Sequence, residues 1–152
     1  MLREKIDDAL KAAMKAKDEK LRVSTLRLIT AAIKDRDIAA RSEDRCNGVT
    51  DDEILAILQK MVKQREDSAT QFEAGGRPEL AAQERSEIAV IREFLPRQLD
   101  DAEIESAVSG VIAELGASGL KDMGRCMGAL KARYAGSMDF GRAGAIVKKA
   151  LV

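Results

Sequence analysis

Three charged residues lie on helix faces that are otherwise apolar, and these faces are the first places to look for chemistry. At 100° per residue, Arg65 shares a face with the apolar residues of its segment, and Glu84 and Glu87 share one with those of the next segment. In an antiparallel hairpin of the two segments, residue 65 lies opposite residue 87. We therefore predict a largely buried structural ion pair between Arg65 and Glu87 or Glu84. Arg22 and Arg36 border the apolar face of an earlier segment and could join this network.

The two glutamates could instead form an acid-base pair or bind a metal ion. No third ligand or nucleophile accompanies them, and the chain has no histidine, which excludes Ser-His and Cys-His pairs and histidine metal ligands. The two cysteines, Cys46 and Cys126, are too few for a typical structural zinc site. We therefore favour the ion pair and predict no catalytic residue, no metal and no cofactor.

Nucleotide-binding motifs are absent from the sequence as well. There is no Walker-type phosphate loop and no dinucleotide fingerprint after a strand. Three Phe, one Tyr and no Trp argue against an aromatic platform that stacks on single-stranded nucleic acid. We expect neither DNA nor a membrane as a partner.

The C-terminal third of the chain is rich in basic residues, although the whole chain is neutral at pH 7. Helical geometry turns Lys121 and Arg125, and likewise Arg142 and Lys149, away from apolar residues and leaves them free to meet solvent or phosphate. A basic surface on a neutral protein indicates a polyanionic partner, and the alternative is an ordinary solvated face. The candidate RNA-binding residues are Lys121, Arg125, Lys131, Arg133, Arg142, Lys148 and Lys149.

Two glycines lie beside the first of these cations, inside a helical pattern. Gly124 and Gly128 are each expected to cost roughly 1 kcal/mol relative to alanine in a helix interior, so they need a reason. One reason is close contact with another helix. The other is the close approach of a phosphate backbone to a bare helix surface beside Lys121 and Arg125.

Apolar periodicity indicates an all-α protein with short connections. The pattern predicts a four-helix unit over residues 1–95 and a three-helix bundle over residues 96–152. Capping residues are expected at Asp18, Thr50, Asp100 and Asp139, and a turn is expected at Asn47. The predicted helices span about residues 2–16, 18–41, 50–74, 78–95, 100–115, 120–134 and 139–151.

An ordered junction is predicted between the two units. Pro96 ends the incoming helix because it lacks an amide hydrogen and disfavours helical geometry at the residue before it. Asp100 and Glu103 have the spacing of a capping box, and Leu99 and Ile104 have that of a hydrophobic staple. Both devices tie the chain after Pro96 to the next helix.

These residues also carry a resemblance to the GatB/YqeY family that covers nearly the whole chain. Two stretches are the most specific, and two upstream stretches extend the match. The first pair comprises Glu84 to Leu99 with the run Phe94-Leu95-Pro96-Arg97-Gln98-Leu99, and Lys121-Asp122-Met123-Gly124-Arg125-Cys126-Met127-Gly128. The upstream stretches comprise Leu26 to Lys34 and Lys63 to Arg77. One departure is Gly136-Ser137-Met138-Asp139, where many relatives have Gly-Arg-Ala-Asp.

The resemblance implies both a fold and a function. Family members have a four-helix unit followed by a three-helix unit, and they are similar to the C-terminal tail of GatB, a component of the glutamine-dependent Glu/Asp-tRNA amidotransferase. In that enzyme the tail helps to hold tRNA, while the chemistry lies in other domains. The resemblance therefore favours a non-catalytic, tRNA-associated module. Three alternatives are a protein adaptor for an amidotransferase or aminoacyl-tRNA synthetase without RNA contact, an accessory to carbon-nitrogen ligase activity with glutamine as amide donor, and an enzyme that uses the carboxylates.

The sequence carries no sign of export. No apolar run approaches the roughly 18 residues that span a membrane, and no apolar signal-peptide core follows the first residues. We therefore predict a cytoplasmic protein, and in that compartment a disulfide between Cys46 and Cys126 is not expected.

Overall fold

The computed structural model describes residues 1–17, 20–43 and 48–152. It divides into two compact units, Met1–Leu95 and Pro96–Val152. The described residues form seven α-helices and one short 3-10 helix and include no strand, so the all-α prediction is confirmed. The predicted cap at Asp18, the turn at Asn47 and the thiol of Cys46 lie outside the described residues.

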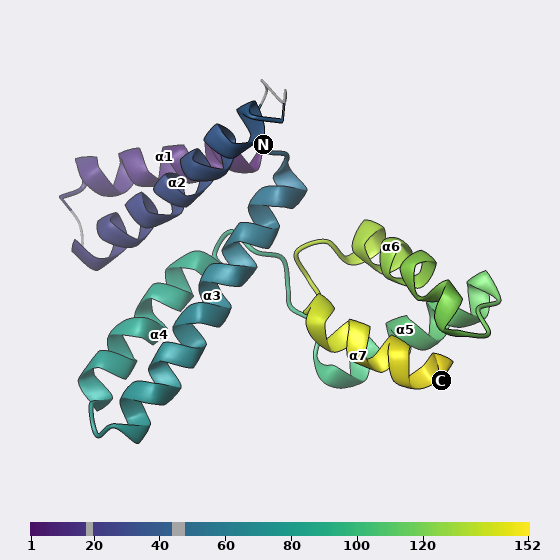
Figure 1. The fold of residues 1–152 in the computed structure, drawn as a ribbon. Coiled ribbons are helices and arrows are strands. Elements are labelled where there is room, and N and C mark those ends of the chain that lie inside the picture. Colours follow the sequence, from purple (N-terminus) through teal and green to yellow (C-terminus); the bar gives the residue numbers. More distant parts are fainter. Residues whose placement is uncertain (18–19, 44–47) are drawn as a thin grey trace. The chain divides into compact units, whose positions relative to one another are not determined.

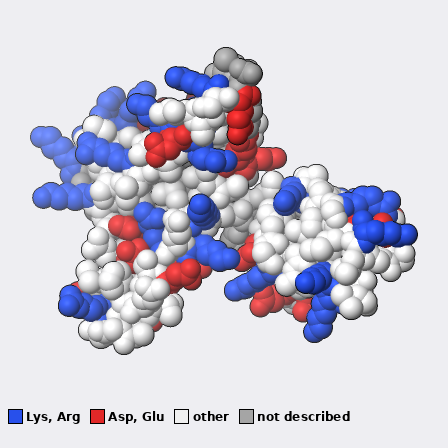
Figure 2. Space-filling view, viewed as in Figure 1, with Lys and Arg blue, Asp and Glu red and all other residues white. Residues whose placement is uncertain are grey.

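The N-terminal unit contains four helices (Figure 1). They are α1 (Leu2–Lys15), α2 (Lys20–Arg41), α3 (Asp51–Ala74) and α4 (Pro78–Arg92). Helices α3 and α4 form a long hairpin, and α2 packs against α1, α3 and α4. Figure 2 shows Lys and Arg side chains gathered over the part of this unit that holds α1 and α2.

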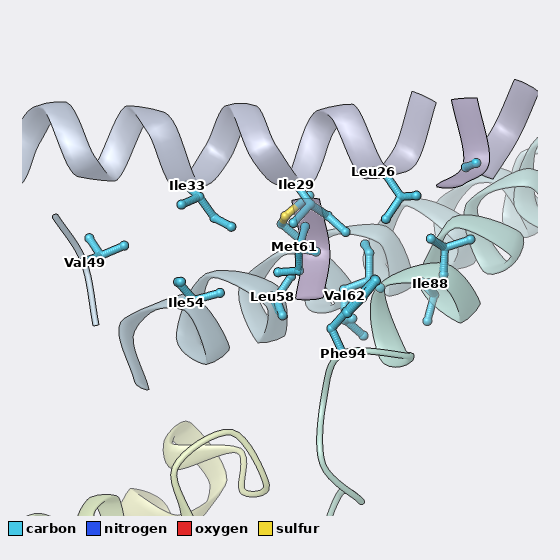
Figure 3. Close-up of a cluster of buried hydrophobic side chains, with 14 of the residues drawn as sticks. Leu26, Ile29, Ile33, Val49, Ile54, Leu58, Met61, Val62, Ile88 and Phe94 are labelled. Atoms are coloured by element: carbon cyan, nitrogen blue, oxygen red, sulfur yellow. The ribbon is translucent and has the colours of Figure 1, made fainter. Parts of the chain in front are cut away.

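The core of the N-terminal unit lies between α2 and the α3–α4 hairpin (Figure 3). Ile29 of α2 is fully buried, and so are Ile54 and Leu58 of α3. Some large apolar side chains of this unit lie outside the core. Met14 is 49% exposed, and Phe72 is only partly buried.

Local signals set the ends of α3. Thr50 accepts a hydrogen bond from the Glu53 amide, and the Glu53 side chain accepts one from the Thr50 amide, which confirms the predicted capping box. At the other end the Arg77 amide donates to the Phe72 carbonyl over 2.7 Å, and the Gly76 amide donates to that of Glu73. This pair of hydrogen bonds needs a left-handed residue, which Gly76 supplies with φ of 74°.

The C-terminal unit contains α5 (Asp101–Leu115), a 3-10 turn (Leu120–Asp122), α6 (Met123–Tyr134) and α7 (Phe140–Leu151). The segment predicted as one helix over 120–134 is thus a 3-10 turn followed by a helix. Cys126 and Met138 are fully buried in the core of this unit, although neither was expected there. Met127 and Tyr134 pack against that core while partly exposed.

The first residues of the C-terminal unit are hydrogen-bonded to its turn between α6 and α7. The Leu99 amide donates to the Ser137 carbonyl over 2.8 Å, and the Gln98 side chain donates to that of Gly136 over 2.6 Å. Asp100 caps α5, and the predicted capping box with Glu103 is present. The predicted capping of α7 by Asp139 is present as well.

Candidate functional site

Arg65 and Glu87 meet between α3 and α4. The Arg65 Nε atom donates to Glu87 Oε2 over 3.0 Å, and the two side chains are 14% and 13% exposed. Arg65 also donates from Nη1 to the Met61 carbonyl over 3.2 Å. The guanidinium and the carboxylate neutralise each other at a place that water hardly reaches. The pair therefore has a structural role in the contact between α3 and α4.

The surroundings of this pair hold no further reactive group among the described residues. Glu84 is partly buried and forms no hydrogen bond or ion pair with the described residues. Arg22 contacts Glu93 at the end of α4 instead of Glu87, and Arg36 is exposed. Across the described part of the chain, no three acidic or cysteine side chains are grouped so as to hold a metal ion.

The α3–α4 hairpin also carries a groove with a volume of about 300 Å³. Its charged lining is already paired, since Arg92 binds Glu66 over 2.7 Å and Arg85 binds Glu73. The pKa of Glu73 is lowered by the hydrogen bond from Arg85.

A second charged cluster, which the sequence analysis did not identify, joins α1, α2 and the start of α3. Arg3 donates two hydrogen bonds to Asp37, of 2.7 and 2.8 Å, and the Val49 amide donates a third, of 3.0 Å. The hydrogen bonds from Arg3, then that from Val49, lower the pKa of Asp37 to about 2 from an ordinary 3.8, against the opposing effect of burial. No motif links residues 3, 37 and 49, so only the fold reveals this cluster.

The three arginines predicted to bind RNA are all held by carboxylates. Arg133 forms two hydrogen bonds with Glu114, of 2.6 and 2.8 Å. Arg142 binds Asp101 over 2.9 Å, and Arg125 lies 3.4 Å from Asp122. The expectation that Arg125 and Arg142 are free to meet phosphate is therefore wrong. Short helices place acidic residues of α5 and of the 3-10 turn within their reach.

These arginines lie toward opposite ends of α5. Arg133 binds Glu114 in the last turn, and Arg125 donates to the Leu115 carbonyl at the same end. Arg142 binds Asp101 in the first turn, which is about 20 Å away at 1.5 Å per residue. The seven predicted residues therefore do not form one compact patch.

The four lysines of the set differ from the arginines. All are exposed, and none forms a hydrogen bond or an ion pair with any described residue. They are Lys121, Lys131, Lys148 and Lys149. Their charges are therefore available to a partner without breaking an existing contact.

The glycine face of α6 is open. A Cβ atom added to Gly124 or to Gly128 would meet nothing within 4 Å. Close contact with another helix of the described chain therefore does not explain these glycines. Packing within the described chain therefore gives no reason for the bare surface of α6 beside Lys121.

The described helices contain none that is long and apolar enough to cross a membrane. In the C-terminal unit, the described arginines are thus paired with carboxylates, whereas its lysines form no ion pair with any described residue.

Comparison with known proteins identifies the family. Residues 3–151 match the family model described as Yqey-like protein. The chain belongs to the YqeY family. The match confirms the resemblance to this family, which the sequence showed over nearly the whole YqeY-family chain.

Curated relatives of this YqeY-family chain occur in yeasts. The protein named Altered inheritance of mitochondria protein 41, mitochondrial, from Lachancea thermotolerans is 35% identical over 108 residues, which cover 70% of this chain and 55% of the relative. The protein of that name from Clavispora lusitaniae is 32% identical over 111 residues, covering 72% and 61%. That from Saccharomyces cerevisiae is 32% identical over 98 residues, covering 63% and 49%. The chain thus matches about half the length of these relatives.

The prediction of a cytoplasmic protein is corrected by these relatives. Each of them is named as mitochondrial. The prediction had rested on the lack of an export signal and of a membrane span. Proteins of more than one compartment lack both features, so their absence does not identify the compartment.

Proposed function

We propose that this YqeY-family protein is a non-catalytic module that binds tRNA through the exposed lysines of its C-terminal unit. The observation that carries the proposal is the contrast in that unit between arginines held by carboxylates and lysines that have no partner among the described residues. Binding of a phosphate backbone depends on cations whose charge is not already neutralised. Lys121, Lys131, Lys148 and Lys149 meet this condition.

The open surface of α6 supports the same ligand. Gly124 and Gly128 leave space above the helix, next to Lys121. A sugar-phosphate backbone can approach a bare helix more closely than one covered by side chains. Most protein contacts to a nucleic acid go to this backbone and require no base-specific pocket, and a large pocket is not needed here.

The paired arginines of the C-terminal unit can add to RNA binding after the lysines. Exposed ion pairs such as Arg133 with Glu114 are typically worth only about 0.2–1 kcal/mol. A phosphate can therefore replace the carboxylate at small cost, and guanidinium binds phosphate through two hydrogen bonds as well. Arg125, Arg133 and Arg142 remain part of the proposed surface as residues that exchange partners on binding.

The test is the affinity for total tRNA, measured across a series of salt concentrations. The intact protein should lose affinity steeply with salt, with a log-log slope of about −0.7 to −0.9 for each neutralised phosphate. A variant with Lys121→Gln, Lys131→Gln, Lys148→Gln and Lys149→Gln should bind more weakly and with a slope shallower by about 3.

A control variant with Lys5→Gln, Lys11→Gln, Lys15→Gln and Lys60→Gln removes the same charge from exposed sites of the N-terminal unit and should keep most of the slope. If the intact protein binds no tRNA even at low salt, the proposal fails and a protein adaptor becomes the better description. If both variants lose the same affinity, net charge and not this surface governs binding.

A further inference from the structure

The outward face of α2 has a regular pattern that the proposed function does not use. Exposed positions recur in alternating steps of four and three residues, which place them in one row along the helix. Every second position of this row is basic, so a cation recurs every seven residues, or about every 10.5 Å. The α2 row consists of Lys20, Ser24, Arg27, Ala31, Lys34, Ile38 and Arg41.

The opposite face of α2 explains why this row must point outward. Leu26, Ile29 and Ile33 are buried in the core against α3 (Figure 3). A helix with one face fixed in the core presents the other to solvent. The basic row is therefore a constant feature of the folded N-terminal unit.

Three of the four arginines of α2 form no ion pair with any described residue, and the fourth, Arg22, pairs with Glu93. Nine of the 13 described arginines lie within ion-pair distance of a carboxylate. Of the four others, three lie on α2, namely Arg27, Arg36 and Arg41. Most described arginines without a carboxylate partner among the described residues thus lie on this one helix, whereas most arginines elsewhere are paired.

Few acidic residues lie on α2 to compensate. The helix carries six basic residues and two acidic ones, Asp35 and Asp37. Asp37 is held by Arg3 and by the Val49 amide. The charge of Arg41 also acts on Asp37, and Asp35 is the other acidic residue of the helix. Figure 2 shows Lys and Arg side chains over this part of the molecule. The row therefore complements a polyanion.

The residues between the cations favour a phosphate backbone over a protein helix. A docked helix would need apolar anchors along its seam, yet only Ile38 of the α2 row is a large apolar residue. Burying the row's four cations in such a seam would also be costly. Ser24 and Ala31 are short, so a backbone can come close, and phosphates can pair with the cations while staying hydrated.

We propose that the α2 row binds the phosphate backbone of RNA, which gives the N-terminal unit an RNA contact of its own. This inference rests on the proposed function, because it takes the ligand to be RNA. It adds a surface on a different unit, built on one helix. The four cations span about 31 Å of helix, from Lys20 to Arg41.

The test compares two variants of the full chain for binding of total tRNA across a salt series. The row variant carries Arg27→Gln, Lys34→Gln and Arg41→Gln. The matched control carries Lys11→Gln, Lys60→Gln and Arg77→Gln, which removes the same charge from exposed residues of the same unit that form no ion pair with any described residue. Both should melt close to the temperature of the parent, since neither variant loses a described hydrogen bond or ion pair; the row variant loses only the longer-range attraction of Arg41 for Asp37.

The row variant should bind with a salt slope shallower by about 2 to 3 and with affinity at low salt reduced about tenfold or more. The matched control should stay within about threefold of the parent. If the row variant behaves like its control while the C-terminal lysine variant still weakens binding, the inference is overturned and the proposed function stands. If the parent binds no tRNA at low salt, both fail together.

Discussion

Arg65 and Glu87 illustrate what a charge on an apolar helix face does in this protein. The pair is 3.0 Å long and mostly enclosed, with 14% and 13% of the side chains exposed. Removing one partner strands the other charge in a poorly hydrated place. The facing positions could be predicted from helical spacing alone, because one hairpin turn fixes which residues of α3 and α4 lie opposite each other.

Arg65→Ala should therefore lower the free energy of unfolding by about 3 kcal/mol, at the low end for a buried pair because some of each side chain reaches water. Chemical denaturation followed by circular dichroism measures this loss. Lys60→Ala, an exposed change on the same helix, is the control and should have almost no effect. A loss of under about 0.5 kcal/mol for Arg65→Ala would show that the pair is only a surface contact.

Asp37 should give the protein a stability that depends on acid pH. Its pKa is about 2 when folded and near 3.8 otherwise, so the folded state holds the charged form more strongly. The contribution is then complete above about pH 4 and is lost as the pH falls through about 2. Asp37→Asn should destabilise the protein by about 1–2 kcal/mol at pH 7.

Stability curves of the parent and of Asp37→Asn measured from pH 7 to pH 2 should converge at the acid end, because protonated Asp37 resembles asparagine. Asp35→Asn is the matched control, since this neighbour is exposed and forms no described contact. A constant difference between the parent and Asp37→Asn at every pH would rule out the charge as the cause.

Among the elements, the helix starts are where sequence and structure agree most closely. The capping boxes at Thr50 and Asp100 and the cap at Asp139 are all present. Such signals are local, because a side chain bonds an amide two or three residues away. The 3-10 turn before α6 was missed, since i to i+3 bonds leave no distinct pattern of residues.

The start of α5 should be both rigid and important for stability. Arg97 and the Asp100 amide hydrogen-bond to Glu103, and these two contacts lower the pKa of Glu103 to about 2. Asp100→Ala should cost about 1 kcal/mol in unfolding free energy, whereas the exposed Glu105→Ala on the same helix should cost little. In the parent, backbone order parameters from NMR at residues 98–100 should be near 0.85. Values below about 0.6 would contradict the anchoring of Gln98 and Leu99 to the turn before α7.

The charge pattern of the helix α2 could not be interpreted from the sequence. The spacing of its basic residues is visible in the chain, but the pairing of arginines elsewhere is not, and that pairing is what makes the row unusual. Likewise, Arg125 and Arg142 looked free because helical spacing describes one helix only. Their partners Asp122 and Asp101 come within reach through the 3-10 turn and through α5.

For the whole molecule, the division into two helical units follows from two separate apolar cores. Most buried residues of Met1–Leu95 form one cluster and those of Pro96–Val152 form another, with no member in common. Amphipathic periodicity is enough to predict the helices and the fold class, because the residues that must be buried set the spacing of apolar positions along each helix. It cannot assign a cellular compartment or a ligand, since neither leaves a mark on the core.

The single tyrosine of the chain has a practical consequence for experiments on these two units. Tyr134 packs half-buried against the core of the C-terminal unit, and the sequence has no tryptophan. Ultraviolet emission of the protein above that of phenylalanine therefore arises entirely from one ring. Its intensity reports the state of the C-terminal unit and is blind to the α1–α4 bundle. A fluorescence titration thus reports on the C-terminal unit alone, whereas a helicity measurement on the same sample reports on the helices of both units, and no label has to be attached.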